Sequence, residues 1–176
     1  MKEKVYDFQH KYMKFSIGGL DEKLAYDRYS TLEHDINKMN VGDVVICKLD
    51  RNSDKRVVGE IIDKSEINNV LVKIRTLTDE DVVYEMKTFH HELIAKPLDL
   101  KPSDFWARWA KAGASVEKKD KQLEVENEFR WMFDGYKVSP GGRVQLAAGQ
   151  EYVTGHKANL TLFNCFVIPS PDYEKD

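Results

Sequence analysis

Cysteine offers the most reactive side chain in this sequence, and the chain has two, Cys47 and Cys165. Cys165 lies in the apolar run 160–168, between Asn164 and Phe166. A thiol in such a strand can undergo reversible thiol–disulfide exchange if it is exposed enough to form the thiolate. The alternative is a small buried hydrophobic side chain, which is the commoner role of a lone cysteine in a strand. Cys47, in the run Val-Val-Ile-Cys-Lys-Leu, is predicted to be a core residue.

A second candidate site is the segment 139–143, Ser-Pro-Gly-Gly-Arg. The adjacent glycines Gly141 and Gly142 allow backbone N–H groups to approach an anion closely, and Ser139 and Arg143 can add further donors. Such a set of groups would suit phosphate. Pro-Gly-Gly is also an ordinary turn, which its dipeptide signals alone favour. The segment is neither a Walker motif nor a dinucleotide fingerprint, because Lys-Ser/Thr and a strand-to-helix GxGxxG are both missing.

Histidines are scattered along the chain, and no Ser-His-Asp order or carboxylate pair stands out. His90 and His91 fall in a predicted strand, so their side chains should point to opposite faces. Metal ligands must converge on one point, and we therefore expect no metal site. The three tryptophans lie on predicted helical stripes and are expected in the core: Trp106, Trp109 and Trp131.

Short β-branched runs separated by turn residues predict a small β-barrel ahead of these candidate sites. The runs are 44–49, 57–62, 70–75 and 82–86. Their regular spacing and hairpin-length gaps predict an antiparallel barrel of SH3-like type over residues 40–96. Residues 1–39 are polar and mixed, and they predict a helical or irregular segment with a short helix around residues 20–32.

Residues 97–176 predict a helical pair followed by a buried strand. Ser103 and Asp104 form a predicted N-cap for a first helix, whose apolar stripe includes Phe105, Trp109, Ala112 and Val116. The charged run 117–121 leads to a second helix, which Gly135 should end.

The run 160–168 is apolar on both faces, which is typical of a strand inside an α/β sheet or barrel. It could pair with the small barrel, with residues 143–146, or with protein outside this sequence. The predicted fold class is α+β.

Composition limits the classes of partner. The 27 Lys and Arg residues against 30 Asp and Glu give a net charge of -3, so no overall field attracts nucleic acid or an anionic membrane. No apolar run approaches the roughly 20 residues of a membrane span, and the N-terminus lacks a signal-peptide pattern. Two distant cysteines fit a reducing compartment. We expect a cytoplasmic protein with neither a membrane nor a nucleic-acid partner.

The order of these segments resembles the N-terminal part of adenosylcobalamin-dependent (class II) ribonucleotide reductases. The resemblance covers about residues 100–171, and its motifs are Phe-Trp-Ala-Arg-Trp-Ala-Lys, Phe-Arg-Trp-Met-Phe, Val-Ser-Pro-Gly-Gly-Arg, Ala-Ala-Gly and Thr-Leu-Phe-Asn-Cys-Phe-Val-Ile. In that family a Pro-Gly-Gly-Arg loop precedes a strand with a Leu-Tyr/Phe-Asn-Cys core. Residues 24–29 and the small barrel resemble N-terminal extensions of some members.

The resemblance implies that residues 97–176 begin an incomplete α/β reductase barrel, and that the protein serves radical conversion of ribonucleotides to deoxyribonucleotides. Cys165 would belong to the redox pair that reduces the ribose at C2′ and becomes a disulfide. The residues implied to lie near the nucleotide are Ser139, Gly141, Gly142, Arg143 and Asn164. The thiyl-forming cysteine of the family, with its Asn and Glu partners, has no counterpart in this sequence.

The resemblance also implies partners. Adenosylcobalamin would dock mainly on protein outside this sequence, a complementing C-terminal reductase chain would complete the barrel, and a thioredoxin-like protein would supply electrons. The chain alone is expected to be inactive, as a fragment or as a subunit of a split reductase of the kind found with phage or intein-interrupted genes.

The alternative is a non-enzymatic module in which the barrel at 40–96 binds nucleic acid or protein. A local basic patch would carry such binding: Lys48, Arg51, Lys55, Arg56, Lys73 and Arg75. A solvated face balanced by neighbouring acids is the favoured interpretation of this set, the acids being Asp50, Asp54, Glu60 and Asp63.

Overall fold

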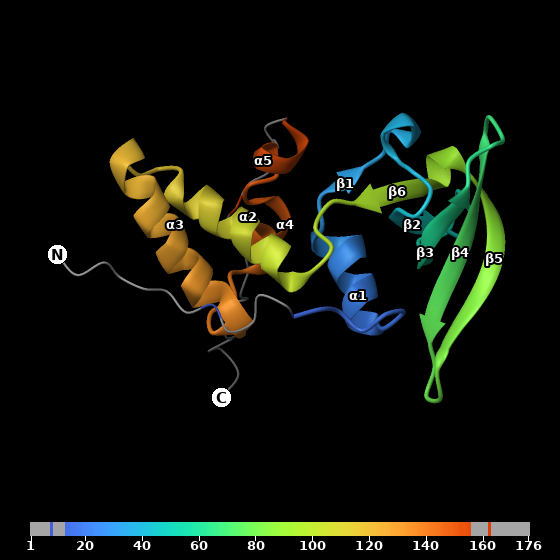
Figure 1. Cartoon of the computed structure of the whole chain (residues 1–176), viewed down its shortest axis with the longest axis horizontal. Helices are drawn as coiled ribbons and strands as arrows, with labels where there is room; N and C mark the ends of the chain where they lie inside the picture. Colours follow the sequence, from blue (N-terminus) through green and yellow to red (C-terminus); the bar gives the residue numbers. More distant parts are fainter. Residues whose placement is uncertain (1–7, 9–12, 156–161, 163–176) are drawn as a thin grey trace, which may run out of the picture.

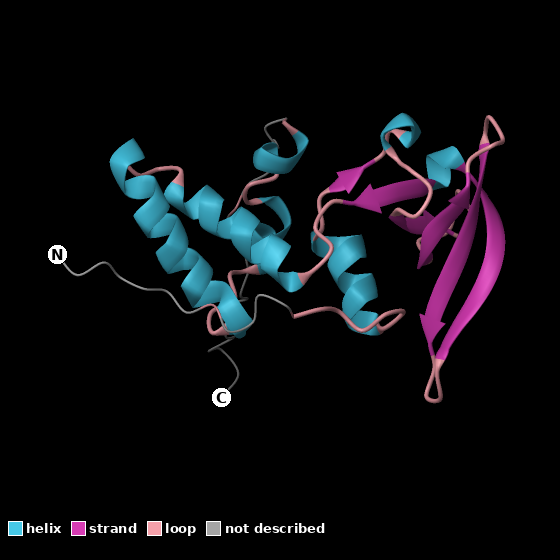
Figure 2. Ribbon diagram, viewed as in Figure 1, coloured by secondary structure: helices cyan, strands magenta, loops and turns pink. Residues whose placement is uncertain are grey.

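The computed structural model describes residue 8, residues 13–155 and residue 162. It places a β-sheet at one end of the molecule and a group of helices at the other, with the short helix α1 between them (Figure 1). The protein is therefore α+β, with strands and helices in separate parts of the chain (Figure 2).

The sheet has six strands in the order β1-β6-β2-β3-β4-β5, and every pairing is antiparallel. The four predicted β-branched runs fall in β2 to β5, and β1 and β6 were not foreseen as strands. The bounds are β1 (Leu32–Glu33), β2 (Val44–Lys48), β3 (Arg56–Asp63), β4 (Asn69–Leu77), β5 (Val82–His90) and β6 (Ile94–Pro97).

Strand β2 is apolar on both faces because each face meets a different core. Val45 and Cys47 join a cluster built almost entirely from the strands, with Met39 and Ile36 from the preceding loop. Val44 and Ile46 point the other way and join the cluster that contains the helices. Strand residues therefore supply most of the first cluster.

The helical part consists of α2 (Pro102–Ala114), α3 (Lys119–Phe133), α4 (Gly142–Ala147) and α5 (Glu151–Thr154). Helices α2 and α3 pack closely where Gly113 meets Phe129, because a Cβ at Gly113 would lie 2.9 Å from that ring. Trp109 stacks edge-on against Phe133, with ring centroids 5.8 Å apart. A three-residue 3-10 turn, η4 (Asp134–Tyr136), follows α3, and Gly135 in it has a left-handed φ of 65°.

The segment before the sheet connects the two parts. It contains α1 (Leu20–Leu24), a π-helical turn η1 (Ala25–Tyr29) and the 3-10 turn η2 (Ile36–Lys38). Glu22 forms an ion pair with Arg75 of β4, and Asp27 forms one with Arg56 of β3. Tyr26 packs in the helix-side core and donates its hydroxyl hydrogen bond to the Leu100 carbonyl.

Several predictions about local structure were wrong. The helix expected at 20–32 ends at Tyr29, because the chain becomes extended at Ser30 and Leu32 pairs with β6. The first helix of the pair begins at Pro102, where Asp104 accepts hydrogen bonds from the Leu100 and Lys101 N–H groups instead of acting as the N-cap. Residues 143–146 are helical, so they cannot be the strand partner considered for the run 160–168.

Two predictions about aromatic side chains also fail. His90 ends β5 and His91 begins a 3-10 turn, η3 (His91–Leu93), so their rings stack 4.6 Å apart instead of pointing to opposite faces. Trp106 and Trp109 are core residues as expected, but Trp131 is 44% exposed and carries the Lys137 ammonium over its ring. None of the helices in the described ranges combines the length and apolar character needed to cross a bilayer.

Candidate functional site

Ser139, Gly141, Gly142 and Arg143 lie on the stretch that leads from η4 into α4. The Gln145 side chain folds back along it and donates hydrogen bonds to the Ser139 hydroxyl (3.0 Å) and the Pro140 carbonyl (2.6 Å). Gly141 precedes α4 in an extended conformation, and Gly142 is its first residue. Local hydrogen bonds therefore define the shape of the segment.

The glycines and the arginine of this segment face solvent. Gly141, Gly142 and Arg143 are all exposed. A Cβ built on Gly142 would meet no atom within 4 Å, so nothing in the described part of the chain requires glycine there. The Arg143 guanidinium makes no hydrogen bond or ion pair to another described residue, which leaves its donors available to a ligand.

Helix α4, which follows the segment, is held by Arg108 of α2, whose side chain is only 2% exposed. Arg108 donates to the Ala148 carbonyl at 2.6 Å and to the Gln145 carbonyl at 3.1 Å. It also donates to the Tyr29 carbonyl at 3.0 Å, at the end of η1. One guanidinium thus donates to carbonyls at the end of α4 and at the end of the N-terminal helical segment. Its planar arrangement of several N–H donors allows it to bind them at the same time.

Asp99 supplies the charge that allows Arg108 to be buried. Its carboxylate lies 3.2 Å from the Arg108 Nε and also accepts the Thr31 N–H at 3.0 Å. Ser30 adds a hydroxyl hydrogen bond to the Asp99 carbonyl and accepts the Asp99 N–H. A buried ion pair is stabilised only when its remaining donors and acceptors are satisfied, and this one is surrounded by such partners.

Two further contacts fix α4 against α2. The Trp109 Nε1 donates to the Gln145 carbonyl at 2.9 Å. Gly149, with φ of 75°, lies so close to α2 that a Cβ there would be 2.5 Å from the Arg108 carbonyl oxygen. The small residues of Ala147-Ala-Gly149 therefore allow the close approach of α4 to α2, and all three are buried.

Of the two cysteines, Cys47 lies within the described residues and Cys165 does not. Cys165 and Asn164, the other predicted site residues, lie outside the described residues. Cys47 is fully buried in the sheet core, and burial raises the pKa of its thiol to about 12. The prediction that Cys47 is a core residue is confirmed, and its thiol is not a reactive nucleophile in the folded protein.

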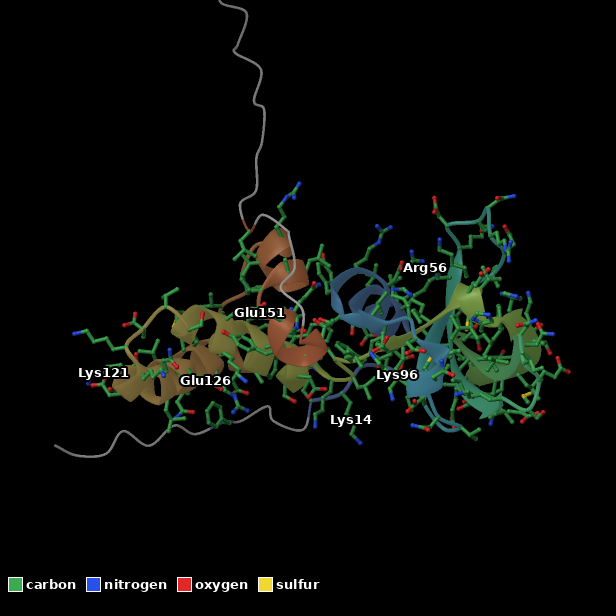
Figure 3. The ribbon with its side chains drawn as sticks, turned by 90° about the horizontal axis from the view of Figure 1, so that it is seen from above. Lys14, Arg56, Lys96, Lys121, Glu126 and Glu151 are labelled. Carbon is green, nitrogen blue, oxygen red and sulfur yellow. The ribbon has the colours of Figure 1, made fainter. Side chains whose placement is uncertain are left out.

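The basic patch proposed for the binding module is largely engaged in internal contacts. Arg56 and Arg75 pair with Asp27 and Glu22 of the N-terminal segment, and Figure 3 shows Arg56 at the boundary between that segment and the sheet. Arg51 pairs with Glu92, and Lys73 lies over the Tyr84 ring at 4.2 Å. The carboxylates that pair with these arginines are Asp27, Glu22 and Glu92. None of them is among the acids predicted to balance the patch, which were Asp50, Asp54, Glu60 and Asp63.

A recess of about 430 Å³ lies elsewhere, between the N-terminal segment and the start of α2. It contains both signs of charge and none of the predicted site residues. Its lining includes Lys14, Phe15, Glu22, Tyr26, Arg75 and Asp104. Burial, followed by the Glu22 carboxylate, raises the pKa of Tyr26 to about 12, so this hydroxyl stays protonated at neutral pH.

Comparison with known proteins does not assign this chain to a family. No protein-family model matches the chain, and no match was found among the curated proteins or the solved structures.

The residues that sequence reasoning missed are Arg108 and Asp99. A signal was present, because Arg108 lies in the middle of the predicted apolar motif Phe-Trp-Ala-Arg-Trp-Ala. A charge beside an apolar stripe requires a buried partner. The sequence alone did not indicate that this partner would be Asp99, nor that the guanidinium would also bind residues 145–148.

Proposed function

We propose that this chain is the N-terminal part of a class II ribonucleotide reductase, in which segment 139–143 contacts the nucleotide. One observation carries the proposal. The Gln145 side chain bonds to Ser139 and Pro140, and the Gln145 carbonyl is bound by Arg108 and Trp109, while the two glycines and Arg143 are exposed to solvent. An exposed guanidinium beside exposed glycine N–H groups, on an anchored support, suits a phosphate group.

Cys165 has the reducing role in this proposal. It would give up electrons to the ribose C2′ as one thiol of a pair, and the resulting disulfide would be reduced again by a thioredoxin-like protein. Cys47 cannot be the other member of the pair in the folded chain, because it is fully buried. The partner thiol and the thiyl-forming cysteine are assigned to a complementing C-terminal chain.

Adenosylcobalamin is assigned to that complementing chain as well. The recess between the N-terminal segment and the start of α2, about 430 Å³, is in the range of pockets for drug-sized ligands and is too small for a corrin with its nucleotide arm. No step of the reaction is therefore attributed to the cofactor here.

Apolar side chains around the segment support a covering partner. Each of the following is at least 36% exposed: Tyr136, Val138, Leu146, Tyr152 and Val153. Exposed apolar groups gathered beside a site are typical of interaction surfaces. A C-terminal chain that completes the barrel would bury them.

The same proposal assigns residues 40–96 to an SH3-like barrel that forms an N-terminal extension of the reductase. Support comes from the return of β6 to pair with β2, from the 3-10 turn before β6, and from a core that strand residues mostly supply. The rival function, a nucleic-acid-binding module on this sheet, has less support because Arg56 and Arg75 are engaged in ion pairs.

The test is complementation. This chain would be combined with the C-terminal part of a class II reductase, adenosylcobalamin and a thioredoxin system, and deoxyribonucleotide formation would be measured. Cys165→Ser should abolish turnover, whereas Cys47→Ala should retain it. Gly142→Ala is a more specific variant, because the added methyl group would meet no atom within 4 Å and should not disturb the fold. It should weaken substrate binding only if a phosphate group approaches the Gly142 backbone.

Arg143→Ala should raise KM by about tenfold or more, as expected for losing a charged hydrogen bond. Arg51→Ala, at an exposed arginine in the turn between β2 and β3, is its control. Turnover that survives Cys165→Ser would overturn the proposal. Oligonucleotide binding that weakens steeply with salt, together with no turnover in any combination, would favour the binding module.

A further inference from the structure

Within the described residues, strand β5 forms one edge of the sheet and pairs with β4 alone. Figure 1 shows it at the end of the molecule farthest from the helices, with no described element beyond it. An edge strand presents a row of unpaired N–H and C=O groups, which another strand can bind.

Hydrogen bonds at the two ends of the β4–β5 ladder show which backbone N–H and C=O groups of β5 point away from β4. The Thr78 N–H donates to the Asp81 carbonyl, and the His91 N–H donates to the Asn68 carbonyl. The register between these ends is unbroken. Because hydrogen-bonded and non-hydrogen-bonded pairs alternate in an antiparallel ladder, the N–H and C=O groups of Tyr84, Met86 and Thr88 point away from β4.

The side chains along this edge are more exposed and more apolar than is usual for a protected edge. Val83, Tyr84 and Met86 are 54%, 52% and 51% exposed. Strand β5 also has nine residues and no proline, and no bulge interrupts its pairing with β4. A long, regular and apolar edge is favourable for adding a further strand.

The charges on β5 are complementary to the same strand running in the opposite direction. If two copies pair around Met86, Glu85 of one copy lies directly opposite Lys87 of the other, and the reverse pair forms by symmetry. A shift by one pair either way would place Glu85 opposite Glu85 or Lys87 opposite Lys87, which is destabilising. Charge thus selects one register out of the neighbouring ones.

Both charged groups are available for this pairing. Neither Glu85 nor Lys87 has an oppositely charged partner among the described residues, and Lys87 only rests over the Phe89 ring at 5.5 Å. An uncharged strand, such as the apolar run 160–168, would leave both charges unpaired. The edge therefore fits a second copy of this chain better than that segment.

We propose that two copies of this chain associate through their β5 strands, in antiparallel pairing centred on Met86, so that the sheet continues across the dimer. The pairing does not depend on the proposed reductase function, because it uses residues at the other end of the molecule from segment 139–143.

The first test is charge reversal in the full chain, with self-association measured by sedimentation over a range of concentrations. Lys87→Glu places glutamates opposite each other in both symmetric pairs, and it should weaken dimerisation at least about tenfold. The double variant Glu85→Lys with Lys87→Glu restores opposite charges and should restore the dimer. Loss of the Lys87–Phe89 contact is common to both variants, so recovery isolates the charge pairing.

The second test is a cross-link that reports the register. In a hydrogen-bonded pair the two Cα atoms at position 86 would be about 5.5 Å apart, within the range of a disulfide. Met86→Cys in a Cys165→Ser background should give a covalent dimer under mild oxidation. Tyr84→Cys in the same background is the control, because its own copy would be about 13 Å away.

A protein that remains monomeric at high concentration overturns the proposal. So does a dimer that Lys87→Glu leaves intact, or that cross-links equally at positions 84 and 86, because the association would then use another surface or another strand.

Discussion

The Nε of Arg108 lies 3.2 Å from the Oδ2 of Asp99, and the two side chains are only 2% and 3% exposed. The pair joins parts of the chain that are distant in sequence, since Asp99 also binds the Thr31 N–H and Arg108 also binds the carbonyls of Tyr29 and Ala148. It therefore holds the N-terminal segment, the start of the helical part and the end of α4 together.

Replacing this guanidinium with an apolar side chain should be severely destabilising. Arg108→Met leaves the Asp99 carboxylate buried without its counter-charge and should lower the free energy of unfolding by about 3–5 kcal/mol. Urea denaturation followed by circular dichroism would measure it. Lys111→Met, on an exposed position of the same helix, should change the stability by less than about 1 kcal/mol.

A double variant distinguishes the buried charge from the lost packing. Adding Asp99→Asn to Arg108→Met removes the unpaired charge, so part of the lost stability should return. A single Arg108→Met variant within about 1 kcal/mol of the unmodified protein would contradict the role given to this pair.

Local sequence patterns predicted many of the helices and strands. They could not predict contacts between segments that are distant in the sequence. β-Branched runs with turn residues predicted β2 to β5, and the apolar stripe with Phe105 and Trp109 predicted α2. Strands β1 and β6 are short and gain their hydrogen bonds from distant partners, so no local pattern marked them. The candidate segment was found by its glycines and arginine, but the position of α4, which follows it, depends on Arg108, whose carbonyl partners carry no sequence signal.

Alkaline pH should destabilise the protein through two buried groups. Burial raises the pKa of the Cys47 thiol from 9.0 to about 12, and burial together with the Glu22 carboxylate raises the pKa of Tyr26 from 10.0 to about 12. Above their ordinary pKa values these groups ionise in the unfolded chain but stay protonated in the folded one. Stability should therefore be fully present below about pH 9 and fall as the pH rises toward 12.

The slope of the free energy of unfolding against pH shows whether Cys47 or Tyr26 causes the loss of stability. Each group can contribute up to about 1.4 kcal/mol per pH unit while only its unfolded form is ionised. Thermal unfolding at pH 7 to 10.5 would show the loss, and Cys47→Ala should flatten the part of the curve between pH 9 and 10. An unchanged slope in that variant would mean that other groups control the alkaline loss.

Burial should decide the strength of two ion pairs, one between α1 and β4 and one between the β2–β3 turn and η3. The Glu22–Arg75 pair has a 2.5 Å contact with side chains 3% and 13% exposed, and Glu22 also accepts the Gly18 N–H at 2.7 Å. The Arg51–Glu92 pair has a similar contact of 2.7 Å, but its side chains are 70% and 57% exposed. Water and salt screen the second pair far more than the first.

Neutralising each glutamate in turn compares these two environments. Glu22→Gln should cost about 2–3 kcal/mol, because Arg75 loses its counter-charge in a partly buried position. Glu92→Gln should cost less than about 1 kcal/mol. Hydrogen exchange adds a local readout, since the Lys23 N–H, which bonds to the Gly19 carbonyl, should exchange faster in Glu22→Gln as α1 loosens from β4. Equal costs for the two variants would mean that α1 is held to the sheet by apolar packing instead of by the Glu22 carboxylate.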